Sequence, residues 1–334
     1  MNAWKRLRSS TLVWPLAALA FILLFNIAFT EGFFRVQVKD GHLYGSLIDI
    51  VKRSAPVMII ALGMTLVIAT KGIDISVGAV TSIVTAVVGI LITRGHSPLA
   101  LVILVPLAAA LLCGAFNGLL VSVFEVQPII TTLILMVTGR GIGLLIIGGR
   151  VKLWRMPSFE FLGSGYLFGL AFPVWIVAVV FLVLFLFLSR NPLGLYIPVV
   201  GGNPLASRYA GIRVRRVTFL VYVFSGLCAG IAGLILTADI KASDASLVGL
   251  YIELDAILAV VIGGTSMNGG KFSLTGTIIG ALIIQSLTTT ILTRGIPVQY
   301  PLVVKASVVI LVILLQSEEF RRRLVGSRAG GRAR

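Results

Sequence analysis

The sequence predicts an all-α, polytopic membrane protein with about ten spanning helices and cytoplasmic N- and C-termini. Hydrophobic residues make up 58% of the 334 residues, and charged residues only 12%, about half the share found in soluble domains. The apolar residues gather into runs close to the roughly 20 residues that cross a bilayer. Basic residues flank these runs and give a net charge of +16, a placement typical of orientation signals rather than of a nucleic-acid partner.

The first apolar run, Thr11–Phe29, follows Lys5, Arg6 and Arg8. A secretory signal peptide has a similar start, but this run is long and further runs follow it, so we expect an uncleaved first helix. The next segment, Glu31–Arg53, is polar and is expected to form an outer loop.

Nine further apolar runs are expected to be helical. They are Ser54–Thr70, Ile75–Thr93, Leu99–Val123, Ile129–Ile147, Phe172–Leu188, Val217–Asp239, Leu254–Gly263, Ser273–Leu292 and Tyr300–Gln316. The run Leu254–Gly263 is short for a span, which indicates a broken or re-entrant helix, or a helix that extends toward Tyr251.

An even number of spans places both termini on the same side of the membrane. In the orientation with cytoplasmic termini, 16 of the 28 basic residues face the cytoplasm and 10 face outward, in agreement with the positive-inside rule. We therefore expect a single permease domain over residues 1–316 and a basic cytoplasmic tail over residues 317–334. The arginines of this tail are expected to meet anionic lipid headgroups.

The longest inner segment, residues 189–216, contains a short helix whose two ends are marked in the sequence. Asn203 is a good N-cap, Pro204 suits the first helical position, and Gly211 suits a left-handed C-terminal cap. A capped helix outside the lipid indicates a docking element, although an ordinary ordered loop remains the alternative. The residues assigned to this element are Asn203, Pro204, Leu205, Ala206, Arg208, Tyr209 and Gly211.

Polar side chains at membrane depth are functional candidates, and we assign Arg140, Asn117 and Asp74 to a translocation path. Each has a structural alternative. Arg140 is equally well explained by backbone carbonyls and a partner acid. Asn117 is well explained as a hydrogen bond between helices, and Asp74 as a cap of the helix that follows it.

Lys305 lies a few residues inside the last run and is expected to extend toward the membrane surface. Glu253 and Asp255 lie at the start of the short run Leu254–Gly263. They are expected to guide a helix break, to line an outer vestibule, or to pair with basic residues of a docked protein.

The sequence does not favour covalent chemistry. The loop from Gly264 to Ser273 fails as a phosphate-binding loop because Lys271 comes one place late and Phe272 replaces the required Ser or Thr. Only two histidines, His42 and His96, are present, so a histidine-based metal or catalytic cluster is not expected. An ion-coupled secondary transporter is the main alternative, but its buried carboxylates are expected at mid-span, whereas these acids lie mostly at span ends.

Several stretches together resemble the ribose-permease-like membrane subunits of bacterial sugar ABC importers. They include Gly63–Thr70, Gly72–Gly78, Ala210-Gly211-Ile212 and Glu253–Gly264. Other stretches, such as Thr132–Val137 and Ala281–Gln285, resemble the galactofuranose-transporting members. One departure is Lys71, where the family usually has glycine, and this leaves the conformation of that turn open.

The resemblance implies an inner-membrane permease that moves a monosaccharide, in particular furanose-form galactose, inward by alternating access. It implies a second permease subunit, ATP-binding cassette ATPase subunits below and a periplasmic sugar-binding protein above. The helix from Asn203 to Gly211 is then the coupling helix that enters an ATPase groove. ATP belongs to the partner subunit, and no cofactor or enzymatic activity is expected of this chain.

Overall fold

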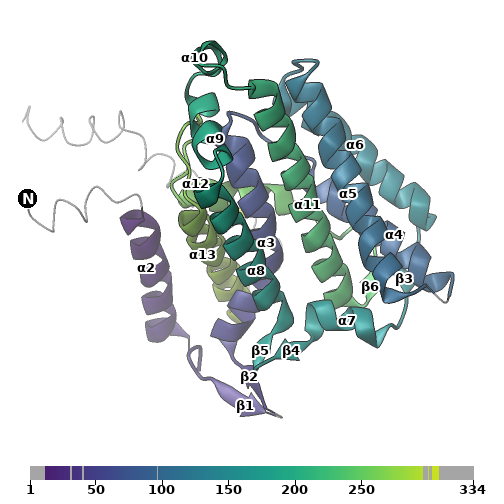
Figure 1. The fold of residues 1–334 in the computed structure, drawn as a ribbon. Helices are drawn as coiled ribbons and strands as arrows, with labels where there is room; N and C mark the ends of the chain where they lie inside the picture. The colour runs from purple at the N-terminus through teal and green to yellow at the C-terminus, as the bar shows by residue number, and fades with distance from the viewer. Residues whose placement is uncertain are drawn as a thin grey trace, which may run out of the picture.

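The computed structural model describes residues 12–30, 32–39, 41–95, 97–295, 300 and 303–307, and these form a helical bundle (Figure 1). The helices of the bundle are α2 (Val13–Phe29), α3 (Ser46–Ala69), α4 (Val77–Thr93), α5 (Leu99–Ser122), α6 (Pro128–Ile147), α8 (Phe172–Arg190), α11 (Val214–Ile240), α12 (Ile252–Ile262) and α13 (Leu274–Thr293). Three shorter helices lie at its two ends, α7 (Pro157–Ser164), α9 (Leu193–Gly202) and α10 (Pro204–Tyr209).

Six helices of the described chain, α3, α5, α6, α8, α11 and α13, are long and apolar enough to cross a membrane. The helices α2, α4 and α9 are apolar but shorter. The predicted polytopic helical class is therefore confirmed, while the count of ten spans and the side of the termini remain predictions. The last predicted span, Tyr300–Gln316, and the basic tail lie almost wholly outside the described residues.

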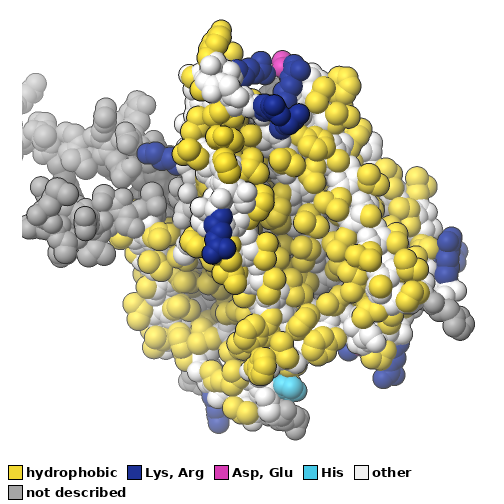
Figure 2. Space-filling model, in the orientation of Figure 1, with side chains coloured by type: hydrophobic (Ala, Val, Ile, Leu, Met, Phe, Trp, Pro, Cys, Tyr) yellow, Lys and Arg dark blue, Asp and Glu magenta, His cyan; other side chains and the backbone are white. Residues whose placement is uncertain are grey.

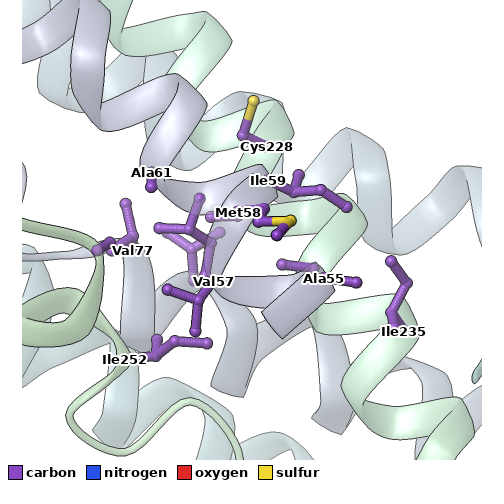
Figure 3. Packing of buried hydrophobic residues seen from close by; sticks show 14 of the residues in the cluster. Ala55, Val57, Met58, Ile59, Ala61, Val77, Cys228, Ile235 and Ile252 are labelled. Atoms are coloured by element: carbon purple, nitrogen blue, oxygen red, sulfur yellow. The ribbon is translucent and has the colours of Figure 1, made fainter. Parts of the chain in front are cut away.

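The helices α3 and α11 form the centre of the bundle, and their buried side chains make the main core (Figure 3). A Cβ atom at Gly63 of α3 would lie 3.0 Å from the Ser225 backbone and 3.1 Å from the Cys228 side chain of α11, which is closer than ordinary van der Waals contact. On its other side α11 packs against α5, where Gly226 lies against Ala110 and Gly114. The small-residue face formed by Gly226 and Gly230 therefore packs against α5 within the chain.

The predicted outer loop Glu31–Arg53 is wrong in its second half, because α3 begins at Ser46. Asp49 lies in the first turn of α3, where its negative charge interacts favourably with the positive end of the helix dipole. Lys52 pairs with Asp239 near the end of α11 at 2.8 Å. A charged residue that interrupts the apolar pattern is therefore part of α3 and has an acidic partner on another helix.

The all-α prediction also misses three short pairs of strands, each antiparallel. β1 (Gln37–Lys39) pairs with β2 (His42–Tyr44), β3 (Lys152–Leu153) with β6 (Ala242–Ser243), and β4 (Tyr166–Leu167) with β5 (Leu170–Ala171). With α7 they lie at the end of the bundle opposite α10 (Figure 1). The runs are only two or three residues long, so no alternating pattern reveals them.

The short run predicted at Leu254–Gly263 is the helix α12, which has 11 residues and therefore extends only about 16 Å. It begins after Tyr251, whose φ of +63° breaks the chain direction at the helix start. Its far end packs against α13, where Gly263 meets the backbone of Gly276. The helix therefore extends to the residue after Tyr251, which is one of the alternatives that the sequence left open, and it is too short to cross a layer of about 30 Å.

Candidate functional site

The predicted capped helix is present as α10. The Asn203 side-chain oxygen accepts a hydrogen bond from the Ala206 amide at 3.0 Å, and Pro204 occupies the first turn. Gly211 follows with a φ of +81°, and its amide donates to the Arg208 carbonyl at 3.0 Å. Both ends thus have the geometry that the residue types predicted.

The outward face of α10 is apolar and uncovered. The Leu205 side chain is 65% exposed and that of Tyr209 is 92% exposed, whereas Ser207 on the opposite face is buried. The Ser207 hydroxyl is within hydrogen-bonding distance of the Val199 carbonyl in α9, at 3.1 Å. One face of α10 is therefore fastened to the bundle while Leu205 and Tyr209 point away from it.

Arg208 already has a partner in this chain, which the sequence did not suggest. Its guanidinium donates to Glu125 in the α5–α6 connection at 3.1 Å, and Arg215 of α11 donates to the same carboxylate oxygen at 3.2 Å. Hydrogen bonds from Arg215 and Arg208 lower the pKa of the Glu125 carboxyl below its usual value. Figure 2 shows basic side chains gathered at this end of the molecule.

The segment before α10 is locked onto the end of α3 by close backbone packing. A Cβ atom at Gly201 would lie 1.7 Å from the Ala69 carbonyl oxygen, so only glycine fits there. The Gly270 amide donates to that same carbonyl at 3.1 Å. Lys71 adopts a φ of +64°, the left-handed conformation that the usual glycine favours, and its ammonium donates to the Gly202 carbonyl at 3.2 Å.

Beyond this junction lies a buried polar network around Asp74. One Asp74 carboxylate oxygen accepts hydrogen bonds from the Ser76 amide and hydroxyl at 3.1 and 2.6 Å, and the other accepts from Ser225 of α11 at 2.8 Å. Asn117 of α5 donates to the Ser76 hydroxyl at 2.8 Å. The prediction that Asp74 caps α4 is wrong, because Ser76 occupies the N-cap and Asp74 joins the turn to α11 instead.

Arg140 lies 12 residues from the start of α6, about 18 Å along the helix. It donates to the Gly249 carbonyl at 3.0 Å and lies 3.9 Å from the Glu253 carboxylate in α12. The two groups meet beside Gly78, where a Cβ atom would lie 2.1 Å from the carboxylate and 3.1 Å from the guanidinium. A carbonyl and a nearby acid therefore surround Arg140, as one of the two sequence interpretations required.

Lys305 does not extend toward a surface, which corrects that prediction. Its ammonium contacts both oxygens of Asp255 at 2.8 Å, and its side chain is only 12% exposed. Asp255 lies in the first turn of α12, and a carboxylate inside the bundle is a stronger partner for an ammonium than a distant headgroup.

The structure brings Asp74, Asn117 and Arg140 together around the first turns of α4. Asp74 and Asn117 meet at the N-cap residue Ser76, and Arg140 lies against Gly78 two residues later. The sequence missed Glu253 as the acid beside Arg140 and Ser225 as the partner of Asp74. It also placed the acids at span ends, whereas Asp74 in the α3–α4 connection and Glu253 in the first turn of α12 are buried, at 1% and 2% exposure.

A bundle of apolar helices, six of them long enough to cross a membrane in the described part of the chain, indicates a polytopic membrane protein. Residues 46–314 match the family described as "Branched-chain amino acid transport system / permease component". The chain belongs to this family of permease components.

Curated relatives with similar sequences are named as sugar permeases. The galactofuranose transporter permease protein YtfT of Escherichia coli (strain K12) is 47% identical over 97% of this chain and 95% of its own. The fructose import permease protein FruF of Bifidobacterium longum (strain NCC 2705) is 38% identical over 95% of this chain and 90% of its own. The ribose import permease protein RbsC of Escherichia coli (strain K12) is 36% identical, over 82% and 86%. No solved structure matches.

Proposed function

We propose that the chain is the membrane-spanning permease subunit of an ATP-driven sugar importer of the bacterial inner membrane. Its cargo is a monosaccharide, with galactofuranose the first candidate. The observation that carries the proposal is the sequence similarity over almost the whole chain to a galactofuranose permease, at 47% identity. The relatives named as fructose and ribose import permeases also support a monosaccharide as the cargo.

In this proposal α10 is the coupling helix for an ATP-binding cassette subunit, which binds the ATP. Leu205 and Tyr209 enter a groove of that subunit, and Arg208 and Arg215 around Glu125 form a charged rim. The support is the exposure of Leu205 and Tyr209 together with the rigid caps of α10. A docking helix transmits force only if its base is fixed, and the packing of Gly201 against Ala69 supplies that fixation.

The proposed translocation path passes the first turns of α4. A displacement of α10 is transmitted through Gly201 and Lys71 to the end of α3, and from there to the turn that Asp74 fixes. Asp74 and Asn117 hold this turn against α11 and α5, while Arg140 faces Glu253 deeper in the bundle. Discontinuous helices such as α12 are a common way to place polar groups along a transport path.

The remaining proposed partners are a second permease subunit, a periplasmic sugar-binding protein at the end opposite α10, and anionic lipid at the basic tail. The termini and residues 189–216 are proposed to be cytoplasmic, because of the bias of basic residues. Residues 1–316 and 317–334 are proposed to be the permease domain and the tail.

The test is sugar uptake into proteoliposomes that contain the permease, its ATPase and its binding protein, over a panel of pentoses and hexoses in furanose- and pyranose-forming series. ATP-dependent uptake of a monosaccharide is the expected result. Uptake of leucine and no sugar would refute the sugar class. Sugar uptake that needs a proton or sodium gradient and no ATP would show the alternative, an ion-coupled transporter.

A further inference from the structure

Two charged groups face each other inside the bundle without satisfying each other. Nη1 of Arg140 and Oε2 of Glu253 are buried and have no hydrogen-bond partner among the described residues. The shortest separation of the pair, from Nη2 of Arg140 to Oε2 of Glu253, is 3.9 Å, too long for a hydrogen bond. Buried charged groups are normally paired and hydrogen-bonded. A third group that hydrogen-bonds to both atoms would therefore stabilise this arrangement.

The neighbouring ion pair shows that the open geometry is specific to Arg140 and Glu253. Two residues further along α12, both carboxylate oxygens of Asp255 accept hydrogen bonds from the Lys305 ammonium at 2.8 Å. Arg140, in contrast, is held back by the Gly249 carbonyl at 3.0 Å. Gly249 has a φ of +70° and lies three residues before the start of α12. The same backbone segment therefore holds Arg140 and positions the first turn of α12, which carries Glu253.

A hydroxyl group matches both unsatisfied atoms. It accepts a hydrogen bond from a guanidinium and donates one to a carboxylate, and a single oxygen that does both joins atoms about 4–4.5 Å apart at ordinary hydrogen-bond lengths. The 3.9 Å separation runs from Nη2, which already donates to the Gly249 carbonyl, to Oε2. Nη1 of the same guanidinium is the nitrogen that lacks a partner and can donate to such a hydroxyl. A free cation is repelled by Arg140 and a free anion by Glu253, so the pair selects an uncharged ligand.

The pair also lies at a suitable depth. Arg140 is about 18 Å along α6, a helix long and apolar enough to cross a membrane, and Glu253 reaches it from the first turn of the 11-residue helix α12. Gly78 of α4 has no side chain, and any Cβ there would displace the carboxylate. The missing side chain at Gly78 therefore lets the carboxylate of α12 and the guanidinium of α6 approach the backbone of α4 closely.

We propose that Arg140 and Glu253 bind a hydroxyl, or two adjacent hydroxyls, of the sugar during its passage. The proposal rests on the proposed function, since it names the residues that recognise the cargo of that path. Binding at this site is weak, because a group held too strongly at mid-path is not released.

The experiment compares Glu253→Gln and Arg140→Lys with the wild-type permease in the reconstituted complex. Each is assayed with the transported sugar and with its series of single-deoxy analogues. Because the binding protein also recognises hydroxyls, every analogue is expressed relative to wild type with the same analogue, which cancels that contribution. Matched controls are Thr138→Ala, on the exposed face of α6, and Asp255→Asn, in the closed pair.

We expect Glu253→Gln and Arg140→Lys each to lower uptake of the parent sugar about ten-fold, the usual effect of one charged hydrogen bond. One deoxy analogue, which lacks the contacted hydroxyl, is expected to be taken up equally by variant and wild type. Thr138→Ala is expected to change nothing, and any loss in Asp255→Asn to be the same for every analogue.

A uniform loss across the parent sugar and all analogues in both variants would overturn the proposal and make the pair structural. Unchanged uptake by both variants would overturn it too, while leaving the sugar-importer function intact. If the wild-type complex takes up no sugar, the proposed function itself fails and this inference falls with it. Thermal unfolding of each purified variant identifies a folding defect, and Arg140→Lys then carries the test if Glu253→Gln does not fold.

Discussion

The ammonium of Lys71 donates to the backbone carbonyl of Gly202 at 3.2 Å, which links the second residue after α3 to the residue just before the N-cap of α10. The Gly270 amide makes a second link to the Ala69 carbonyl from the α12–α13 connection. Three segments far apart in the sequence thus meet at one backbone junction. The proposed coupling from α10 to the turn that contains Asp74 starts at this junction.

Gly201→Ala should break this junction. Its Cβ atom would lie 1.7 Å from the Ala69 carbonyl oxygen, so the backbones must separate, and forced overpacking of this kind costs about 1–3 kcal/mol of stability. We expect a lower unfolding temperature and lost sugar uptake. The matched control is Gly202→Ala, where nothing lies within 4 Å of a new Cβ atom. Equal behaviour of the two variants in thermal unfolding and uptake would contradict the role of the junction.

The double variant Leu205→Ala with Tyr209→Ala should release the ATPase. Burying each of these side chains in a partner is worth roughly 1.5–3 kcal/mol, so association should weaken at least ten-fold. The permease itself should fold normally, because both side chains are exposed in this chain. Co-purification of the ATPase together with uptake measures the effect.

Phe168→Ala is the control for that variant, because Phe168 is an 86% exposed aromatic residue between β4 and β5, which lie at the end of the bundle opposite α10 (Figure 1). It should leave ATPase association unchanged. Full association and full uptake by the double variant would show that α10 is an ordinary loop.

The two caps of α10 should differ in importance. Asn203→Ala removes the hydrogen bond to the Ala206 amide and should cost about 1 kcal/mol of local helix stability. Gly211→Val should be worse, because a β-branched residue tolerates a φ of +81° poorly. We expect a modest fall in ATPase association for the first and a severe fall for the second. The reverse order would mean that the C-terminal cap does not hold the helix shape.

The charged rim around Glu125 predicts a dependence on pH. Arg215 and Arg208 lower the pKa of its carboxyl, so the stabilisation is present above the unfolded pKa of about 4.3 and is lost as the pH falls through the lower folded pKa. The difference in stability between wild type and Glu125→Gln should be small at neutral pH, because the site is exposed. It should vanish in acid, because the Glu125 carboxyl is then protonated and uncharged, as the Gln side chain is. Unfolding temperatures measured from pH 7 to pH 3 test this, and a difference that grows in acid would contradict it.

The sequence predicted the elements whose signals are local. The apolar runs up to Leu292, the capped ends of α10 and the short length of α12 all follow from residues within one segment, and these agree with the structure. The first two turns of α3 were missed because Lys52 and Arg53 interrupt the apolar pattern, although Lys52 is paired with Asp239 from a distant helix.

Partners across the bundle could not be predicted in the same way. Asp74 looked like a cap because it precedes α4, but its second oxygen is taken by Ser225, 151 residues later. Lys305 looked like a surface anchor until Asp255 was placed beside it. A side chain's choice among local and distant partners depends on how the helices pack, and that information is not carried by spacing in one segment.

The last prediction concerns the buried carboxylate of Asp74. Asp74→Leu leaves the Ser76 amide, the Ser76 hydroxyl and the Ser225 hydroxyl without their acceptor, and each unsatisfied buried donor costs about 1–3 kcal/mol. Asp244→Leu is the matched control, because Asp244 accepts the same pair of bonds from Ser246 in a partly exposed loop where water can replace it. We expect the first variant to unfold at a much lower temperature and the second to change little. Similar losses in the two variants would mean that the network around Asp74 does not anchor the turn to α11, and that the path from α10 to the polar zone runs elsewhere.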